Sequence, residues 1–306
     1  MTRKVKGIIL GMLIFGSFYA QGQETKELTG LFPIYRNGKW GYVDRTCKIV
    51  IQPRFDWAGK FFEGLAVVNI GGKLGYIDKN GNMVINPNFG YAGVFSEGLA
   101  VVAVDVTGKW GYIDKTGEYA INPQFEFADE FSEGLAAVMI GPAWGAKYGY
   151  IDKTGKYAIN PQFSLAKSFH EGLAIVGSVK EGMFSVKYGY MDKTWKMVIN
   201  PRFDEAENFH EGVAAVMVGG KYGYIDKTGK IVINPRFEVA EDFSEGLAAV
   251  KSIAGGKAGY IDRTGKYVIK PQFDEAEDFS EGMAGVGIGL KRGYIDKIGK
   301  YVCNPE

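Results

Sequence analysis

Apolar and polar residues alternate in short runs along almost the whole chain, and the runs recur in a fixed order. In residues 109–138 the apolar runs are W-G-Y-I, Y-A-I, F-E-F-A and L-A-A-V, with turn residues such as D-K-T-G between them. Runs of three to five apolar residues bounded by Gly, Pro, Asn and Asp are typical of β-strands. The pattern therefore predicts an all-β protein built from repeats.

Two motifs give the repeat its period. The motif E-G-(L/V/M)-A follows the motif G-Y-(I/V/M)-D with a glycine-to-glycine spacing of 23 residues in all seven cases. Successive G-Y glycines are 34 to 40 residues apart, a spacing that predicts tandem structural units. These glycines are Gly41, Gly75, Gly111, Gly149, Gly189, Gly223, Gly259 and Gly293.

All variation in length lies in one loop, between the L-A-A-V run and the next G-Y motif. The eight loops have 6, 6, 8, 10, 12, 6, 8 and 6 residues, so every length is even. One extra residue on each arm of a β-hairpin leaves every side chain on its own face, whereas a single extra residue would reverse a strand. The even lengths therefore predict a hairpin at this point.

Each unit then contains three antiparallel strands, and about eight units fill the chain. The strands are the L-A-A-V run, the Y-G-Y-I-D run and the run that ends before N-P. Asp and Gly suit the D-K-T-G turn, and the proline ends the third strand. Seven linkers such as Phe125–Phe131 join the units, and we interpret them as a 3₁₀-like turn or a bent crossing segment. The last unit has no linker.

Two architectures satisfy this plan, because one three-stranded unit buries too little surface to be stable alone. One is an open, solenoid-like superhelical stack, and the other is a closed β-propeller. A propeller blade has four strands, so each linker would have to supply the fourth. Residues 23–30, QETKELTG, do not resemble a linker that could complete the last unit. We therefore favour the open array and keep the propeller as the alternative.

Whether the two cysteines can form a disulfide depends on which architecture is correct. Cys47 occupies the turn-glycine position of the first unit, and Cys303 replaces the third-strand isoleucine of the last. They could pair only if the two ends of the domain meet. In an open array they are two separate thiols.

The motifs K-W-G-Y-I-D, N-P-x-F and F-S-E-G-L-A-x-V resemble those of bacterial WG-repeat proteins over about residues 31–305. This chain departs from the pattern, because Trp precedes the G-Y glycine only at Trp40 and Trp110. The resemblance implies an all-β repeat domain, often extracytoplasmic, with no shared enzymatic activity.

The N-terminus predicts export. Arg3, Lys4 and Lys6 precede an apolar run from Gly7 to Ala20, which is typical of a secretory signal peptide and short for a membrane span. An uncleaved amphipathic anchor is the alternative. We divide the chain into a signal peptide (1–22), a short linker (23–30) and the repeat domain (31–306). The mature chain should have no membrane span and be periplasmic, cell-surface or secreted.

Composition narrows the function classes. The net charge is +1, and removal of residues 1–22 makes it −2, so nothing indicates nucleic-acid binding. The sequence has two histidines, two cysteines and no nucleophile or P-loop motif, so we expect neither catalysis nor a cofactor. A glycosidase-type carboxylate pair stays open, because Asp and Glu are plentiful.

Most polar residues that recur are expected to be structural. The Asp of G-Y-I-D should cap its turn, and the Glu of E-G should accept backbone N–H bonds or pair with a lysine. His170 and His210 replace Ser in the F-S-E-G motif of consecutive units. We expect one repeat to separate them too far to share a metal, whose ligands lie about 2 Å from it.

Departures from the repeat are the candidate binding residues. The two longest hairpin tips, 139–147 and 177–187, carry Trp144, Met183 and Phe184. Insertions in repeat proteins often mark the binding face, although these side chains could instead pack on each other. Trp195 replaces a turn glycine where a positive φ is expected, so a compensating contact should support it.

Three functions fit these features. The first is an exported scaffold that binds another macromolecule, an unidentified protein, through its array surface. The second is an envelope glycan binder that uses aromatic pairs such as Trp110 with Tyr112. The third is a passive spacer, for which shortening the 177–187 tip should change no phenotype.

Overall fold

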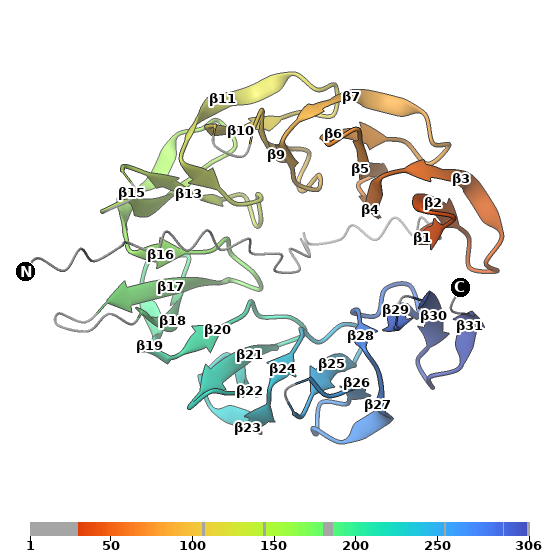
Figure 1. The fold of residues 1–306 in the computed structure, drawn as a ribbon. Helices are drawn as coiled ribbons and strands as arrows, with labels where there is room; N and C mark the ends of the chain where they lie inside the picture. The colour runs from red at the N-terminus through yellow and green to blue at the C-terminus, as the bar shows by residue number, and fades with distance from the viewer. Residues whose placement is uncertain are drawn as a thin grey trace, which may run out of the picture.

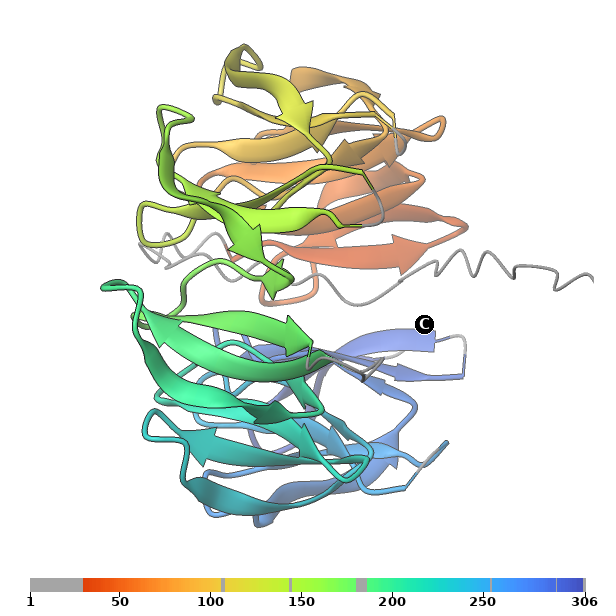
Figure 2. The same ribbon diagram turned by 90° about the vertical axis from the view of Figure 1, so that its left-hand side faces the viewer.

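The strands form a closed ring of small sheets around one axis. Figure 1 looks down this axis, and Figure 2 shows the ring from its rim, with the first four sheets above and the last four below. The computed structural model describes residues 30–105, 108–142, 145–179, 186–253, 255–289 and 291–304. Within these residues the strands make eight antiparallel sheets, and no helix has the length and apolar character that a membrane crossing requires. The fold is a β-propeller, whose blades we number 1–8 in chain order.

In the described residues blade 1 has three strands and every other blade has four, which run from the axis to the rim in chain order (Figure 1). The inner strands of blades 2–8 are β4 (Trp57–Phe62), β8 (Tyr91–Ala92), β12 (Phe127–Ala128), β16 (Leu165–Ala166), β20 (Glu205–Ala206), β24 (Val239–Ala240) and β28 (Glu275–Ala276). The second strands of blades 1–8 are β1 (Phe32–Arg36), β5 (Leu65–Ile70), β9 (Ala100–Ala103), β13 (Ala136–Ile140), β17 (Leu173–Val179), β21 (Val213–Val218), β25 (Ala248–Lys251) and β29 (Met283–Ile288).

The two remaining strands of each blade lie farther from the axis. The third strands are β2 (Lys39–Val43), β6 (Lys73–Ile77), β10 (Trp110–Ile113), β14 (Lys147–Ile151), β18 (Val186–Asp192), β22 (Lys221–Asp226), β26 (Ala258–Ile261) and β30 (Lys291–Asp296). The outer strands are β3 (Ile49–Phe55), β7 (Met83–Phe89), β11 (Tyr119–Phe125), β15 (Tyr157–Phe163), β19 (Met197–Phe203), β23 (Ile231–Phe237), β27 (Tyr267–Phe273) and β31 (Tyr301–Cys303).

The open solenoid-like array predicted from the repeats is wrong, because the units close into a ring. That prediction counted three strands per unit and treated each linker as a bent connection. In the structure each linker supplies a short strand on the axial side of the next unit. In β12, for example, Phe127 and Ala128 pair with Met139 and Val138. This strand is the fourth one that a propeller blade requires.

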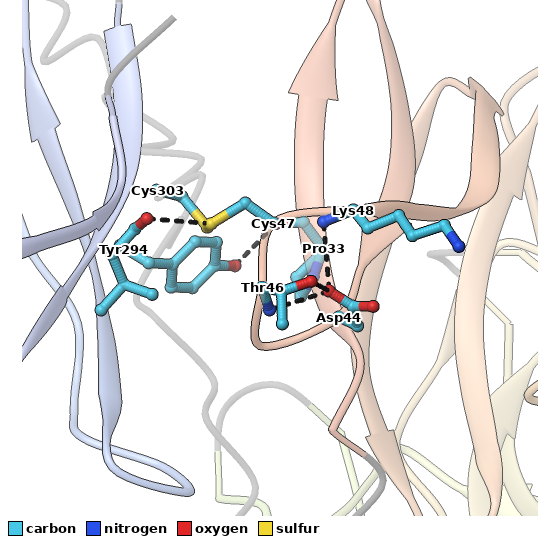
Figure 3. The surroundings of a disulfide bond; sticks show 8 residues. Pro33, Asp44, Thr46, Cys47, Lys48, Tyr294 and Cys303 are labelled. Atoms are coloured by element: carbon cyan, nitrogen blue, oxygen red, sulfur yellow. Dashed lines mark hydrogen bonds between the residues drawn. A yellow bond between two sulfur atoms is a disulfide. The ribbon is translucent and has the colours of Figure 1, made fainter.

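The ring closes between blade 8 and blade 1. Strand β1 lies against β30, and the Tyr294 hydroxyl donates a 2.6 Å hydrogen bond to the Pro33 carbonyl oxygen (Figure 3). Cys47 and Cys303 form a disulfide, with their Cα atoms 5.6 Å apart. The cysteines are therefore not the separate thiols that an open array implied.

The hairpins predicted from the even loop lengths are confirmed. In every hairpin of the described chain, the residue before the loop pairs directly with the G-Y glycine, as Val68 does with Gly75. The longest loop keeps this register, because Val176 pairs with Gly189. Loop length therefore changes only how far a hairpin projects.

The G-Y glycine is required because the outer strand approaches it closely. A Cβ atom on Gly111 would lie 2.6 Å from the Ile121 carbonyl oxygen and 2.7 Å from the Pro123 nitrogen. The register between β10 and β11 shifts on both sides of Tyr112, so the strands are irregular at this approach. Pro123 is tolerated because β11 is an edge strand, with no further strand to use its N–H.

The hydrophobic core lies between neighbouring blades. Tyr112 is fully buried, and its ring packs on Phe131 of the next blade with 4.7 Å between ring centres. The Tyr112 hydroxyl donates a 2.7 Å hydrogen bond to the carbonyl oxygen of Asp129. The same bond recurs from blades 1 to 7, always across 17 residues. A buried hydroxyl needs such a partner, so these tyrosines fix each blade to the next.

Among the described residues, no inner strand pairs with the axial edge of β1 in blade 1. In blade 3, the carbonyl oxygen of Val101 accepts a hydrogen bond from the N–H of Gly93, the residue that follows the inner strand β8. Pro33 stands at the corresponding position of β1, and its carbonyl oxygen already accepts the Tyr294 hydroxyl. Proline has no N–H for a further strand, so the centre of this edge is protected from pairing.

Candidate functional site

The two faces of the ring carry different loops. The hairpin face carries the tips that join second and third strands. It also carries the start of each inner strand, because Asp204 before β20 accepts the N–H of tip residue Gly219 at 2.8 Å. The turn face carries the D-K-T-G and E-G turns, which lie together where Lys153 pairs with Glu97 at 3.0 Å.

The repeated aspartates cap turns, as predicted. Asp114 Oδ1 accepts hydrogen bonds from the Thr116 hydroxyl and from the N–H groups of Thr116 and Glu118. These bonds, the Thr116 hydroxyl first, hold the pKa of Asp114 below its usual value. Equivalent bonds occur in all eight turns of the described chain. These carboxylates therefore have a structural role.

The repeated glutamates link blades, so their predicted structural role is confirmed. The Glu97 carboxylate accepts the N–H of Gly134 in the next blade at 3.0 Å and pairs there with Lys153. The φ of Glu97 is 54°, which is unusual for a residue other than glycine. The last glutamate of the series, Glu281, accepts the Gly30 N–H at 3.0 Å across the closure. The partner glycine belongs to the next blade, which the sequence did not indicate.

The predicted hairpin-tip residues Trp144, Met183 and Phe184 lie outside the described residues, and their binding role stays a prediction. The structure does describe the strands that lead into and out of these two tips. Strands β17 and β18 have seven residues each and are the longest pair of second and third strands in the described chain. The longest hairpin of the ring therefore rises from blade 5.

Trp195 lies on the turn face. Its φ is 67°, and its ring packs against Tyr150 of blade 4 and Phe169 of blade 5, with ring centres 5.8 and 5.9 Å away. These contacts supply the compensating packing expected for a bulky residue at a positive φ. Its role in binding stays a prediction.

A row of aromatic rings on the hairpin face was missed from the sequence. Tyr91, Trp110, Phe127 and Tyr148 follow one another across blades 3 and 4, with ring centres 4.3, 5.0 and 6.2 Å apart, and each is partly exposed. We call these four residues the aromatic arc. They come alternately from inner and third strands, so the sequence does not place them together. The available signal was the aromatic residue at one position of three consecutive linkers, beginning with Trp57.

The glycan hypothesis relied on Trp110 with Tyr112, and the structure separates these two rings. Tyr112 is fully buried between blades, whereas Trp110 belongs to the partly exposed aromatic arc. The pair therefore offers no common stacking surface.

Charged side chains gather around the axis, at the two positions that follow the inner-strand alanine. Lys60 pairs with Glu277 at 3.4 Å, and Lys167 pairs with Glu207 at 2.9 Å. The carboxylates at these positions are Asp129, Glu130, Glu207, Glu241, Asp242, Glu277 and Asp278. Their number exceeds that of the lysines, so the axis is acidic.

Burial and mutual repulsion keep protons on some of these groups. Burial, and then the neighbouring Asp129, raise the pKa of Glu130 to about 8. Burial and then Glu241 raise the pKa of Asp278 to about 7. Glu130 and Asp278 are therefore only partly ionised at neutral pH.

The two histidines lie closer together than the repeat spacing suggested. The rings of His170 and His210 have centres 5.3 Å apart, and His210 Nε2 lies 3.2 Å from Asp242 Oδ2. Burial, and then His210, lower the pKa of His170 to about 4, so this ring is neutral at neutral pH. Within the described residues no group of three His, Cys, Asp or Glu side chains is arranged to hold a metal.

Comparison with known families agrees with this blade structure. The family profile described as the WG containing repeat matches residues 40–73, 75–109, 110–141, 148–178, 188–222, 222–252 and 259–289. The chain belongs to the WG-containing repeat family. Each match of this WG-repeat protein begins in or close to the third strand of a blade. No curated protein matches the WG-repeat sequence.

Solved structures of other proteins share the fold of this WG-repeat chain. Dihydro-heme d1 dehydrogenase NirN in complex with DHE has a TM-score of 0.61 and 12% identity, over 94% of this chain and 76% of that chain. Hsv2 of Kluyvelomyces marxianus has a TM-score of 0.52 and 11% identity, over 76% of this chain and 89% of that chain. At these identities the likeness concerns the fold alone, and it supports the closed ring over the open array.

Proposed function

We propose that this chain is an exported scaffold that binds another protein through its hairpin face. The observation that carries the proposal is the aromatic arc. Its four rings lie side by side, and each is partly exposed. Aromatic side chains are enriched in protein interfaces, because each buries a large area. Tyr148 of the arc lies in β14, at the base of one of the two longest hairpins, so the arc adjoins the described part of that hairpin.

The proposed location is extracytoplasmic. The Cys47–Cys303 disulfide supports it, since such bonds persist in oxidising compartments. The basic and apolar N-terminal segment supports it independently. Periplasmic, cell-surface and secreted forms are all compatible with these two observations.

The proposed role is binding without catalysis. An active site requires a distinct set of groups that can act on a substrate. The repeated Asp and Glu side chains instead make the same structural bonds in successive blades, as Asp114 and Glu97 illustrate. This use of the most abundant polar groups favours a scaffold over an enzyme.

Site-specific photo-crosslinking tests the proposal. A benzophenone amino acid replaces Phe127 on the hairpin face, and a matched variant carries it at Tyr119, an exposed aromatic position of the rim strand β11. Both are expressed in the native cell and irradiated. We expect a discrete protein adduct from position 127 and none from position 119.

Other results would replace the proposal. An adduct at position 127 that glycosidases remove, and proteases do not, would establish the glycan-binding alternative. No adduct, together with an unchanged phenotype after the 177–187 tip is shortened to six residues, would establish the passive spacer. Equal protein adducts from both positions would show that the hairpin face is not the binding surface.

A further inference from the structure

A small pocket lies in the seam between blades 8 and 1, on the axial side of β1. In the described part of the chain, blade 1 is the blade in which no inner strand covers this side (Figure 1). The lining of the pocket includes Ile34, Tyr35 and Trp40 of blade 1, and Gly285 and Arg292 of blade 8. Its volume is about 20 Å³, which is the room that one water molecule or one methyl group needs.

In the other blades an alanine occupies the corresponding place. Ala128 of the inner strand β12 belongs to one buried cluster with Val101 and Tyr112 of the preceding blade. Gly285 and Tyr294 hold the positions of these two residues in blade 8, and both line the pocket. The inner-strand alanines are Ala58, Ala92, Ala128, Ala166, Ala206, Ala240 and Ala276. The pocket therefore has the size and the surroundings of an alanine methyl group.

The backbone of β1 offers the bonds that a short inner strand uses. In blade 4 the carbonyl oxygens of Met139 and Ala137 accept N–H groups of the residues that flank the inner strand, each at 2.9 Å. Tyr35 and Pro33 hold these two positions in blade 1. The N–H that Pro33 lacks is not used by an inner strand, because the Ala137 N–H donates to the Ser168 hydroxyl instead. Pro33 thus prevents a longer ladder along β1 and keeps the bonds of a two-residue strand.

The Tyr294 hydroxyl supplies a further bond at the same place. In blades 1–7 the corresponding tyrosine donates to the carbonyl oxygen of the residue after the next blade's inner-strand alanine, as Tyr112 does to Asp129. Tyr294 donates to the Pro33 carbonyl oxygen instead (Figure 3). A segment bound beside β1 would offer Tyr294 the usual acceptor, and the Pro33 carbonyl oxygen would then accept the N–H of that segment.

The sequence before β1 does not provide a matching segment. Each inner-strand alanine lies six residues before its turn glycine, as Ala128 does before Gly134. Gly30 holds the turn-glycine place of blade 1, because its N–H bonds Glu281, the last glutamate of the E-G series. Counting back six residues from Gly30 gives Glu24, whose side chain is much larger than the pocket.

The residue before the alanine is aromatic in blades 2–4. In blade 4 the Phe127 ring lies 5.0 Å from Trp110 and 6.2 Å from Tyr148, measured between ring centres. Arg292 and Trp40 hold these two positions beside the pocket, and both line it. Arg292 pairs with a glutamate of its own blade, and a planar guanidinium also packs on aromatic rings. The seam therefore suits an aromatic side chain next to the alanine.

We propose that the seam between blades 8 and 1 binds an extended segment of the partner protein in which an aromatic residue is followed by alanine. The alanine fills the pocket, the aromatic ring packs between Arg292 and Trp40, and the segment becomes the fourth strand of blade 1. Addition of a strand to a sheet edge is a recurring mode of peptide recognition, in which pockets for alternate side chains give specificity. This inference rests on the proposed function and names the segment that the partner presents.

Chemical-shift titration of isotope-labelled residues 23–306 tests this inference. Three synthetic peptides of equal length place Phe-Ala, Phe-Leu or Ser-Ala between the same flanking Gly and Ser residues. We expect the Phe-Ala peptide to shift the backbone amide of Tyr35 and the indole N–H of Trp40. The Phe-Leu peptide should bind at least about tenfold more weakly, because the larger side chain overfills the pocket. The Ser-Ala peptide should bind about threefold more weakly, because it lacks the ring.

Two variants locate the site. Gly285→Val adds a side chain to the pocket lining, and the nearest atoms to its Cβ would be those of the flexible Glu277 carboxylate, 2.9 Å away. Valine stands at this position in blades 2 and 3, as Val67 and Val101, so the variant should fold. It should weaken binding of the Phe-Ala peptide at least about tenfold. Tyr119→Ala, which shortens an exposed side chain on the rim, is the control and should leave binding unchanged. The amide spectrum verifies that each variant is folded.

The inference is overturned if the Phe-Ala and Phe-Leu peptides bind equally, if the shifts lie away from Tyr35 and Trp40, or if no peptide binds. Binding that requires removal of residues 23–29 would also overturn it, because the chain's own segment would then be the occupant. Its failure can be distinguished from failure of the proposed function. A protein adduct at position 127 that Gly285→Val leaves unchanged would retain the proposed function and refute this inference. A glycan adduct at position 127, together with selective binding of the Phe-Ala peptide, would refute the proposed function and support the peptide site.

Discussion

Removal of the Cys47–Cys303 disulfide should strongly destabilise the ring. The two cysteines are separated by 256 residues, so the bond closes nearly the whole domain into one loop. In the chain-entropy relation, a loop of this length lowers the conformational entropy of the unfolded chain enough to contribute about 5.5 kcal/mol at 25 °C. We therefore expect Cys47→Ser combined with Cys303→Ser to lower the free energy of unfolding by about that amount.

Equilibrium unfolding in guanidinium chloride measures this change. The mature chain and the double serine variant are compared by tryptophan fluorescence and by circular dichroism, and coincident curves from the two probes justify a two-state analysis. The variant should unfold at a lower denaturant concentration with a larger m value, because its unfolded state is more extended. The unmodified chain under reducing conditions is the control, and should match the variant.

A loss of less than about 1 kcal/mol would refute the entropy argument. It would mean that the unfolded chain is already constrained, or that closure depends mainly on non-covalent bonds. Tyr294→Phe distinguishes these two explanations, because it removes the hydroxyl that bonds Pro33 and leaves the disulfide in place. One hydrogen bond typically contributes about 1 kcal/mol to the free energy of unfolding. If non-covalent closure dominates, this variant should lose more than that amount.

Three further predictions concern single residues. Gly111→Ala should destabilise the protein by at least about 2 kcal/mol in denaturant unfolding, because its Cβ would overlap the Ile121 carbonyl oxygen, and unchanged stability would contradict this. Trp195→Gly relieves about 1 kcal/mol of backbone strain but removes a ring packed on Phe169, so thermal unfolding should show a net loss of about 1–3 kcal/mol. The folded-state pKa of Glu130 is raised to about 8, so the native state binds a proton that the unfolded chain releases above about pH 4.5. Stability should therefore fall as the pH rises from about 4.5 to about 8, most clearly between about pH 7 and 8, where the histidines are largely deprotonated in both states, and Glu130→Gln should make this fall shallower.

The sequence predicted the hairpins because their physics is local. Even loop lengths follow from the two-residue period of a strand, and pairs such as Val176 with Gly189 keep that register at any hairpin length. The turn role of Asp114 was predictable for the same reason, since its partners lie two and four residues away.

The ring closure was missed for two reasons. The strand that completes each blade is very short, and closure depends on contacts between blades that are distant in sequence. The fourth strand contains only two residues in most blades, such as Phe127–Ala128 in β12, and two residues show no periodicity. Closure also depends on the rotation between neighbouring blades, which arises from inter-blade packing such as that of Tyr112 on Phe131. The segment 23–30 suggested an open end, although blade 1 closes the ring through β1 instead.

The aromatic arc could not be predicted for a related reason. Trp110 and Phe127 lie on different blades, and only the ring geometry brings the third strand of one beside the inner strand of the next. The sequence did show that Trp57, Tyr91 and Phe127 share one linker position. It did not show that this position lies on the hairpin face around the axis.

The disulfide has a consequence for resistance to proteolysis. A linear chain that a protease cuts once in an exposed loop becomes two pieces, and either piece can diffuse away. Here a single cut at any hairpin tip between Cys47 and Cys303 leaves one covalently continuous molecule, because the two pieces remain joined through sulfur. Release of a fragment from this region requires two cuts, and the inter-blade hydrogen bonds would still hold that fragment in place. The long hairpins can therefore project into a protease-containing environment, and one cut in a tip does not dismantle the ring.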